Sequence, residues 1–108
     1  MSQNKTRALA HMVFFTLNKS TPASRAALVA GCRKYLSRHP GTLHFSAGTR
    51  ATACDRDVND TAFDVALHIV FRSQAAHDRY QAAPRHLAFI EAFRANWKQV
   101  RVFDSLLG

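Results

Sequence analysis

Hydrophobic and polar positions alternate with a period of two in four stretches of the chain, and this period predicts β-strands. The strands are expected over residues 9–17, 42–51 and 63–71, with a shorter one around residues 100–103. In the first stretch, apolar residues occupy both the odd and the even positions, so both faces of this strand are expected to be apolar. In the third, the large side chains share one face: Phe63, Val65, Leu67, Ile69 and Phe71.

Two regions between these strands have the spacing of amphipathic helices. Thr21 followed by Pro22 is typical of an N-cap with proline in the first helical position, so a helix is expected from there to about Ser37. A second helical region begins after Ser73 and is interrupted at Pro84. Its second part is expected to reach about residue 97. The residues expected on its apolar face are Leu87, Ile90, Phe93 and Trp97.

The order of these elements, β-α-β-β-α(α)-β, defines the fold class. It is the α+β, ferredoxin-like arrangement, in which a four-stranded antiparallel sheet carries its helices on one face. A length of 108 residues suits a single domain. We therefore expect one domain over residues 9–108, preceded by a flexible N-terminal segment over residues 1–8.

The face of the sheet opposite the helices should be polar if it meets water. Instead, apolar side chains occupy the strand positions that point to this face. A second apolar face of this size indicates a protein partner, most economically a second copy of the chain in a homodimer. The residues expected at this contact are Met12, Phe14, Ala66, Val70 and Phe103.

The net charge of +8 does not change this interpretation, because the cations are dispersed and no run exceeds Arg33-Lys34. A nucleic-acid footprint usually gathers on one face, and the third strand lacks the glycine of RNA-recognition motifs, so specific nucleic-acid binding is not expected. The apolar stretch over residues 8–17 is too short for a membrane helix. We expect a cytoplasmic protein in which Cys32 and Cys54 are reduced thiols.

Three segments resemble the stress-responsive α/β-barrel domain family. They are His11-Met-Val-Phe-Phe15, the stretch from His39-Pro-Gly to Gly48, and the second half of the chain from Phe63 to Asp104. The most specific part is Tyr80-Gln-Ala-Ala-Pro-Arg-His86-Leu-Ala-Phe89, which is similar to the family's Tyr…His-Pro-x-His-x-x-Phe signature. The resemblance implies a ferredoxin-like protomer that pairs with its mate to form a dimeric α+β barrel.

The family includes a plant polyketide (olivetolic acid) cyclase, whose pocket lies between the sheet and the helices. Its catalytic tyrosine and histidine match Tyr80 and His86. A histidine suits the removal of a proton next to a carbonyl, and a tyrosine hydroxyl can stabilise the enolate oxygen. The same pocket is expected to bind a ligand through His11 and apolar walls formed by Val65, Leu67, Trp97 and Val102.

The chain also departs from the cyclase. Ala83 and Val65 stand where the cyclase has histidines, and Arg85 occupies a position where a small residue is common. No zinc-type histidine spacing, calcium loop or haem signature is present, so no metal and no cofactor are expected.

Three hypotheses follow for function. The favoured one is a small homodimeric module that binds an apolar or aromatic molecule. The second is a cofactor-independent, cyclase-like lyase that uses Tyr80 and His86. The third is a purely structural assembly module with a filled interior. A monooxygenase remains an analogy at the level of the fold alone.

Overall fold

The computed structural model describes residues 6–108. Four strands and three α-helices follow one another in the predicted order. Of the expected N-terminal segment, residues 1–5 lie outside the described residues, and residues 6–8 have no regular secondary structure. The elements are β1 (Leu9–Leu17), α1 (Pro22–Leu36), β2 (Thr42–Thr49), β3 (Val65–Phe71), α2 (Gln74–Ala82), α3 (Pro84–Phe93), the 3-10 turn η1 (Arg94–Asn96) and β4 (Trp97–Leu106).

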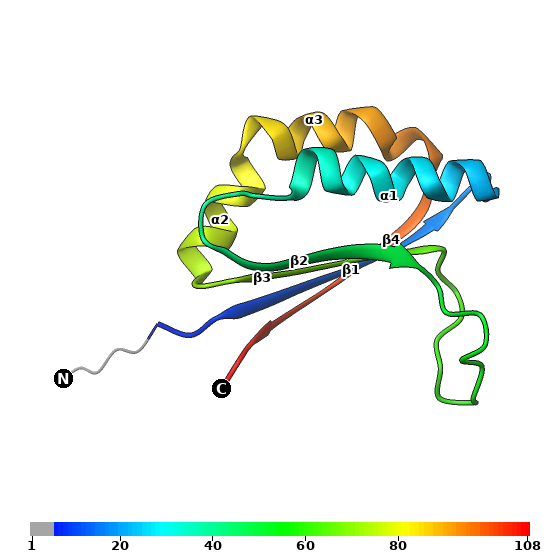
Figure 1. The fold of residues 1–108 in the computed structure, drawn as a ribbon, viewed down its shortest axis with the longest axis horizontal. Helices are drawn as coiled ribbons and strands as arrows, with labels where there is room; N and C mark the ends of the chain where they lie inside the picture. Colours follow the sequence, from blue (N-terminus) through cyan, green and yellow to red (C-terminus); the bar gives the residue numbers. More distant parts are fainter. Residues whose placement is uncertain (1–5) are drawn as a thin grey trace.

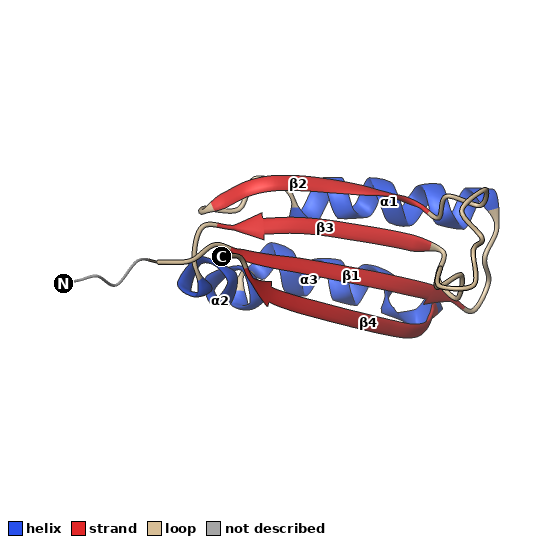
Figure 2. Cartoon of the chain, turned by 90° about the horizontal axis from the view of Figure 1, so that it is seen from below, coloured by secondary structure: helices blue, strands red, loops and turns tan. Residues whose placement is uncertain are grey.

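The four strands form one antiparallel sheet in the order β2-β3-β1-β4. All three helices lie on the same face of this sheet (Figure 1). Seen from below the sheet, the strands lie in front and the helices behind them (Figure 2). This two-layer arrangement confirms the predicted ferredoxin-like fold. No helix within residues 6–108 is long and apolar enough to cross a membrane.

The predicted helix boundaries are set by their capping residues. The Thr21 side chain accepts a hydrogen bond from Ser24 N at 3.0 Å, and the Ser24 hydroxyl accepts one from Thr21 N at 2.8 Å, which completes a capping box at α1. The Ser73 hydroxyl caps α2 in the same way by accepting from Ala76 N. The extended backbone of Ala83, before Pro84, separates α2 from α3.

The prediction that places Trp97 on a helix is wrong, because α3 ends at Phe93 and Trp97 is the first residue of β4. Asn96 explains the early end. Its side-chain oxygen accepts from Lys19 N at 2.9 Å and its carbonyl accepts from Asn18 N at 2.8 Å, which ties the chain to the loop after β1. The strand therefore starts directly after Asn96.

The prediction that places Phe63 on the same face of the strand as Val65 is also wrong. Phe63 precedes β3, and its ring packs against Phe14 on the opposite face, with ring centroids 5.1 Å apart. Asp64 interrupts the alternation, since its carboxylate accepts from Leu17 N at 2.8 Å and from the Ser20 hydroxyl at 2.8 Å. In β2, the strand is irregular between residues 42 and 44, and the side chain of Leu43 is 63% exposed.

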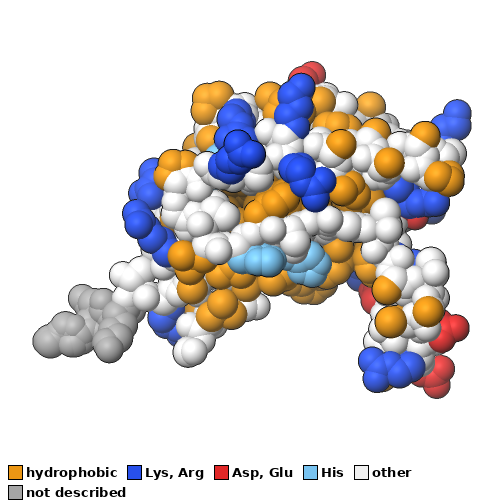
Figure 3. Space-filling model, viewed as in Figure 1, with side chains coloured by type: hydrophobic (Ala, Val, Ile, Leu, Met, Phe, Trp, Pro, Cys, Tyr) orange, Lys and Arg blue, Asp and Glu red, His pale blue; other side chains and the backbone are white. Residues whose placement is uncertain are grey.

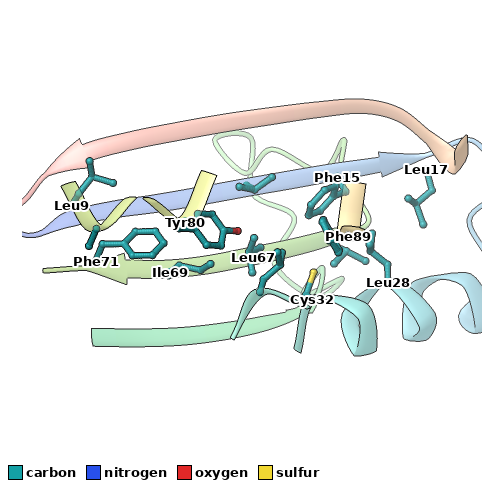
Figure 4. Close-up of a cluster of buried hydrophobic side chains, with 14 residues drawn as sticks. Leu9, Phe15, Leu17, Leu28, Cys32, Leu67, Ile69, Phe71, Tyr80 and Phe89 are labelled. Carbon is teal, nitrogen blue, oxygen red and sulfur yellow. The ribbon is translucent and has the colours of Figure 1, made fainter. Parts of the chain in front are cut away.

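The core lies between the sheet and the helices, as Figure 4 shows for its labelled side chains. Helix α1 contributes Leu28, Cys32 and Leu36 to this core. Burial raises the pKa of the Cys32 thiol to about 12, so Cys32 is an unreactive, free core thiol. Gly31 permits the close approach of α1 and α3, because a Cβ there would lie 2.3 Å from the Phe93 ring.

Candidate ligand-binding cavity

A cavity of about 180 Å³ lies between the sheet and the helices. Six of the seven residues predicted for the site line it, and they come from β1, β3, α2, α3 and β4. The seventh, Val65, is completely buried in the core at the start of β3 and is not among the lining residues. The six are His11, Leu67, Tyr80, His86, Trp97 and Val102.

The cavity exists because the helix layer does not cover the whole inner face of the sheet. Val102 is the cross-strand partner of Val13, and Val100 is the partner of Phe15. Val13 is only 5% exposed, whereas Val102 is 49% exposed on the neighbouring strand. Within the described residues, the inner side of β4 is therefore the open wall of the cavity.

Tyr80 and His86 meet across the break between α2 and α3. Their ring centroids are 4.7 Å apart. Tyr80 is buried among the core side chains, with its hydroxyl directed along β3 toward Leu67 (Figure 4). Burial raises the pKa of Tyr80, so its phenol keeps its proton and can donate a hydrogen bond.

His86 presents an unsatisfied polar atom at this place. Its Nδ1 is buried and has no hydrogen-bond partner within residues 6–108. Burial lowers the pKa of His86, and this effect outweighs the opposing contribution of the Gln81 backbone; nearby histidines lower the pKa slightly further. The ring is consequently neutral near pH 7, and a neutral imidazole can act as a base or bind a polar group of a ligand.

Further polar side chains surround Tyr80 on the side toward the start of β1. His11 Nδ1 donates to Asp104 Oδ1 at 2.6 Å, and desolvation lowers the pKa of His11 despite that carboxylate. The His39 ring meets Tyr80 edge-on with centroids 4.9 Å apart, and its Nε2 is anchored 2.8 Å from the Tyr35 carbonyl. Tyr80 therefore lies between three histidines.

Sequence reasoning missed two members of this cluster, His77 and Asp104. The ring of His77 on α2 is 5.2 Å from that of His11. Asp104 is the cross-strand partner of His11 in the β1–β4 pairing. The alternation in β4 could have placed Asp104 on the inner face with Val102, but its position opposite His11 depends on the register. Together, His11, His77 and Asp104 could hold a metal ion.

Two other hollows lie away from these residues. A larger and more polar cleft of about 370 Å³ is lined by Arg25, Arg50 and Asp64, among others. Another of about 260 Å³ lies on the outer face beside Phe14 and Phe103. Neither contains any of the predicted site residues.

The outer face of the sheet carries the predicted apolar residues, and Figure 2 shows no helix over it. Phe14 is central to this surface, with its ring centroid 5.1 Å from that of Phe63 and 5.8 Å from that of Phe103. Phe103 is 53% exposed. The cations, by contrast, are scattered over the helix layer and the long loop in the view of Figure 3 and form no single patch there.

Comparison with known proteins supports this description of the fold. The sequence model of one protein family, described as "Stress responsive A/B Barrel Domain", matches residues 9–106. Among curated proteins, no significant match was found.

Solved structures provide similar folds over nearly the whole chain. A dabb family protein with a ferredoxin-like fold from Mesorhizobium loti is 24% identical, with a TM-score of 0.77 over 94% of this chain and 99% of that one. A dimeric ferredoxin-like protein of unknown function from Thermobifida fusca is 16% identical, with a TM-score of 0.77 over 95% and 93% of the two chains. A hydroxynitrile lyase from Passiflora edulis is 18% identical, with a TM-score of 0.75 over 96% of each chain.

Proposed function

The chain belongs to the stress-responsive α/β-barrel domain family, and on that premise we propose that it is a homodimer that binds a small apolar or aromatic molecule between sheet and helices. The observation that carries the proposal is the cavity itself. Its wall is mainly aliphatic and aromatic, and its few polar groups converge from Tyr80, His86 and His11. Binding sites for small molecules commonly combine an apolar wall with a few placed polar groups.

The size of the cavity limits the ligand. A volume of about 180 Å³ is close to the roughly 150 Å³ of an engineered cavity that holds benzene. It is smaller than the roughly 300 Å³ at which pockets for drug-sized molecules begin. The proposed ligand is therefore a single aromatic ring or a short branched chain with one polar substituent that reaches His86 Nδ1.

The homodimer is supported by the outer face of the sheet. An apolar surface on which Phe103 is exposed and Phe14 and Val70 are half-buried is typical of a protein interface. The similar protein from Thermobifida fusca is described as dimeric. A second copy meeting this face would use the same residues on both protomers, as a two-fold interface requires.

The pairing of Tyr80 with His86 favours a catalytic role as a second candidate. In a lyase-like reaction, His86 would accept a proton from a carbon next to a carbonyl, and the Tyr80 hydroxyl would stabilise the enolate oxygen with a hydrogen bond. The Passiflora edulis neighbour is a lyase. The neutral state of His86 and the protonated state of Tyr80 are the forms that this chemistry needs.

Ligand binding is tested by screening monocyclic aromatic alcohols, aldehydes and acids with ligand-observed NMR. We expect at least one to bind with a stoichiometry of one per protomer, and Val102→Phe, which narrows the open wall, to abolish that binding. Val58→Phe is the matched control, because Val58 is 82% exposed in a loop. Equal binding by both variants would place the ligand elsewhere and contradict the proposal.

Catalysis is tested with substrates of two classes. In an aromatic cyanohydrin, His86 would accept the hydroxyl proton while the bond to cyanide breaks and an aldehyde forms; in a linear polyketone, it would accept a proton from the carbon next to a carbonyl for aldol closure. If the protein is an enzyme, His86→Gln should lower kcat by about 100-fold or more while the ligand still binds. The control His44→Gln changes a histidine on β2 outside the cavity. Absence of turnover by the unaltered protein would leave the binding function and exclude the lyase role for these substrates.

A further inference from the structure

Three side chains from three elements converge at the end of the cavity near the start of β1. His11 comes from β1, Asp104 from β4 and His77 from α2. Each can offer one ligand atom, and these atoms all lie within 4.8 Å of one another. We propose that His11, His77 and Asp104 form a binding site for a divalent transition-metal ion of the zinc type, an inference that goes beyond the proposed binding of an organic ligand.

The positions of two ligands are fixed by the sheet. His11 and Asp104 are direct cross-strand partners, and their side chains meet on the inner face, with Nδ1 to Oδ1 at 2.6 Å. The second Asp104 oxygen, Oδ2, lies 3.9 Å from His77 Nε2. In a tetrahedral zinc site, bond lengths near 2.1 Å place neighbouring ligand atoms about 3.4 Å apart. These two separations bracket this value, and all three ligand atoms lie within 4.8 Å of one another, so rotation of the partly exposed His77 and Asp104 side chains would complete the site.

The hydrogen bond between His77 and Asp78 suits metal binding. The Nδ1 of His77 lies 3.0 Å from Asp78 Oδ1, and because a carboxylate can only accept, Nδ1 carries the proton. The lone pair of His77 is therefore on Nε2, the nitrogen that faces Asp104. A ligating histidine whose other nitrogen is held by a carboxylate is the usual arrangement in metal proteins.

His11 needs one rearrangement. Its Nδ1 proton, which now lies in the hydrogen bond to Asp104, moves to Nε2 of the same ring, so that Nδ1 and the carboxylate both face the ion. His11 is 4% exposed, so this ligand nitrogen is shielded from water. Gln81 Nε2, 3.3 Å from His77 Nε2, must turn away or present its amide oxygen as a fourth ligand.

The ligand set selects the class of metal. Two imidazoles and one carboxylate suit zinc, cobalt, nickel or ferrous iron, whereas magnesium and calcium prefer oxygen ligands alone. Three protein ligands leave at least one coordination position free, as in catalytic rather than structural zinc sites. Because His11 also lines the cavity, that free position would be next to the proposed organic ligand.

The test is titration of metal-free protein with Zn²⁺ by calorimetry and with Co²⁺ by visible absorption. The experiment uses a tag-free Cys54→Ser background, because the exposed Cys54 thiol can bind zinc by itself. We expect one ion per protomer and the intense visible bands of low-coordinate Co²⁺. His77→Gln and Asp104→Asn should each abolish both signals, and Asp78→Asn should weaken binding about 10- to 100-fold.

Matched controls are His44→Gln and His68→Gln on the two neighbouring strands β2 and β3, which should leave metal binding unchanged. His77 and Asp104 are both partly exposed, so their variants are expected to fold, which circular dichroism of the metal-free proteins verifies. Absence of stoichiometric binding by the parent protein overturns the proposal. Binding that survives in folded His77→Gln and Asp104→Asn, or that depends on His44 or His68, overturns it equally.

Discussion

Both faces of the sheet are apolar, but the apolar side chains of the inner face are covered by helices, whereas those of the outer face are not. On the inner face, Phe15 and Leu67 are almost fully buried against the helices, and a small cavity with histidines remains beside them. On the outer face, Phe103 is 53% exposed, and the aromatic rings around Phe14 contact one another rather than a covering layer of described residues.

This difference separates two roles that a small domain must combine. The inner face supplies most of the folding energy of the protomer and encloses the candidate ligand site. The outer face adds little to the protomer, because its side chains remain near water, but it can bury a large area against a second copy. Changes on the two faces should therefore affect different measurements.

The largest effect is expected on the inner face. Phe15→Ala removes a ring that packs against Phe89 and Trp97, with centroids 6.1 and 5.1 Å away, and should lower the free energy of unfolding by about 3–5 kcal/mol. Urea denaturation at low protein concentration, where the protomers are separate, measures this loss. Phe103→Ala should cost far less under the same conditions, and equal losses would refute the distinction between the faces.

The next effect concerns association. Phe103→Asp places a charge in the proposed interface and should weaken the homodimer by roughly 2 kcal/mol or more, about 30-fold, while the protomer stays folded. Light scattering after size exclusion, over a range of concentrations, measures the shift from dimer to monomer. Val58→Asp in the exposed loop is the control. A Phe103→Asp protein that remains dimeric would show that the copies meet through another surface.

The smallest effect is a pH dependence from the inner face. Burial lowers the pKa of His11 and His86 below the ordinary value of 6.5, so the unfolded chain binds more protons than the folded one once the pH falls below that value. The free energy of unfolding should therefore decrease as the pH drops from about 6.5 toward the lowered values. His86→Gln should flatten this decrease in urea titrations, and an unchanged slope would contradict the burial of a neutral His86.

Much of this fold follows from local sequence signals. The alternation in residues 9–17 and the Thr21-Pro22 cap act over a few residues, and the structure has both features where they are predicted. The helical position of Trp97 and the strand face of Phe63 were predicted wrongly because tertiary contacts decide them. Asn96 and Asp64 bind the loop after β1, far away in sequence, and these bonds override the local periodicity.

The candidate site likewise contains residues that the sequence could predict and residues that it could not. Resemblance to the family identified Tyr80 and His86, His11 was expected in the same pocket, and the structure brings all three to one cavity. His77 and Asp104 could not be added from the sequence, because their proximity to His11 depends on the β1–β4 register and on how α2 docks. Tertiary contacts of this kind leave no periodic signal.

The open inner side of β4 has a kinetic consequence. Because Val100 and Val102 are already accessible, a ligand can reach the cavity without any helix moving away or any segment unfolding. Entry into the single protomer is then a diffusional encounter with an open wall rather than a gated step, and differences in affinity between ligands should lie mainly in their dissociation rates. Residence time, rather than access, is what the histidine-lined end of the cavity would control.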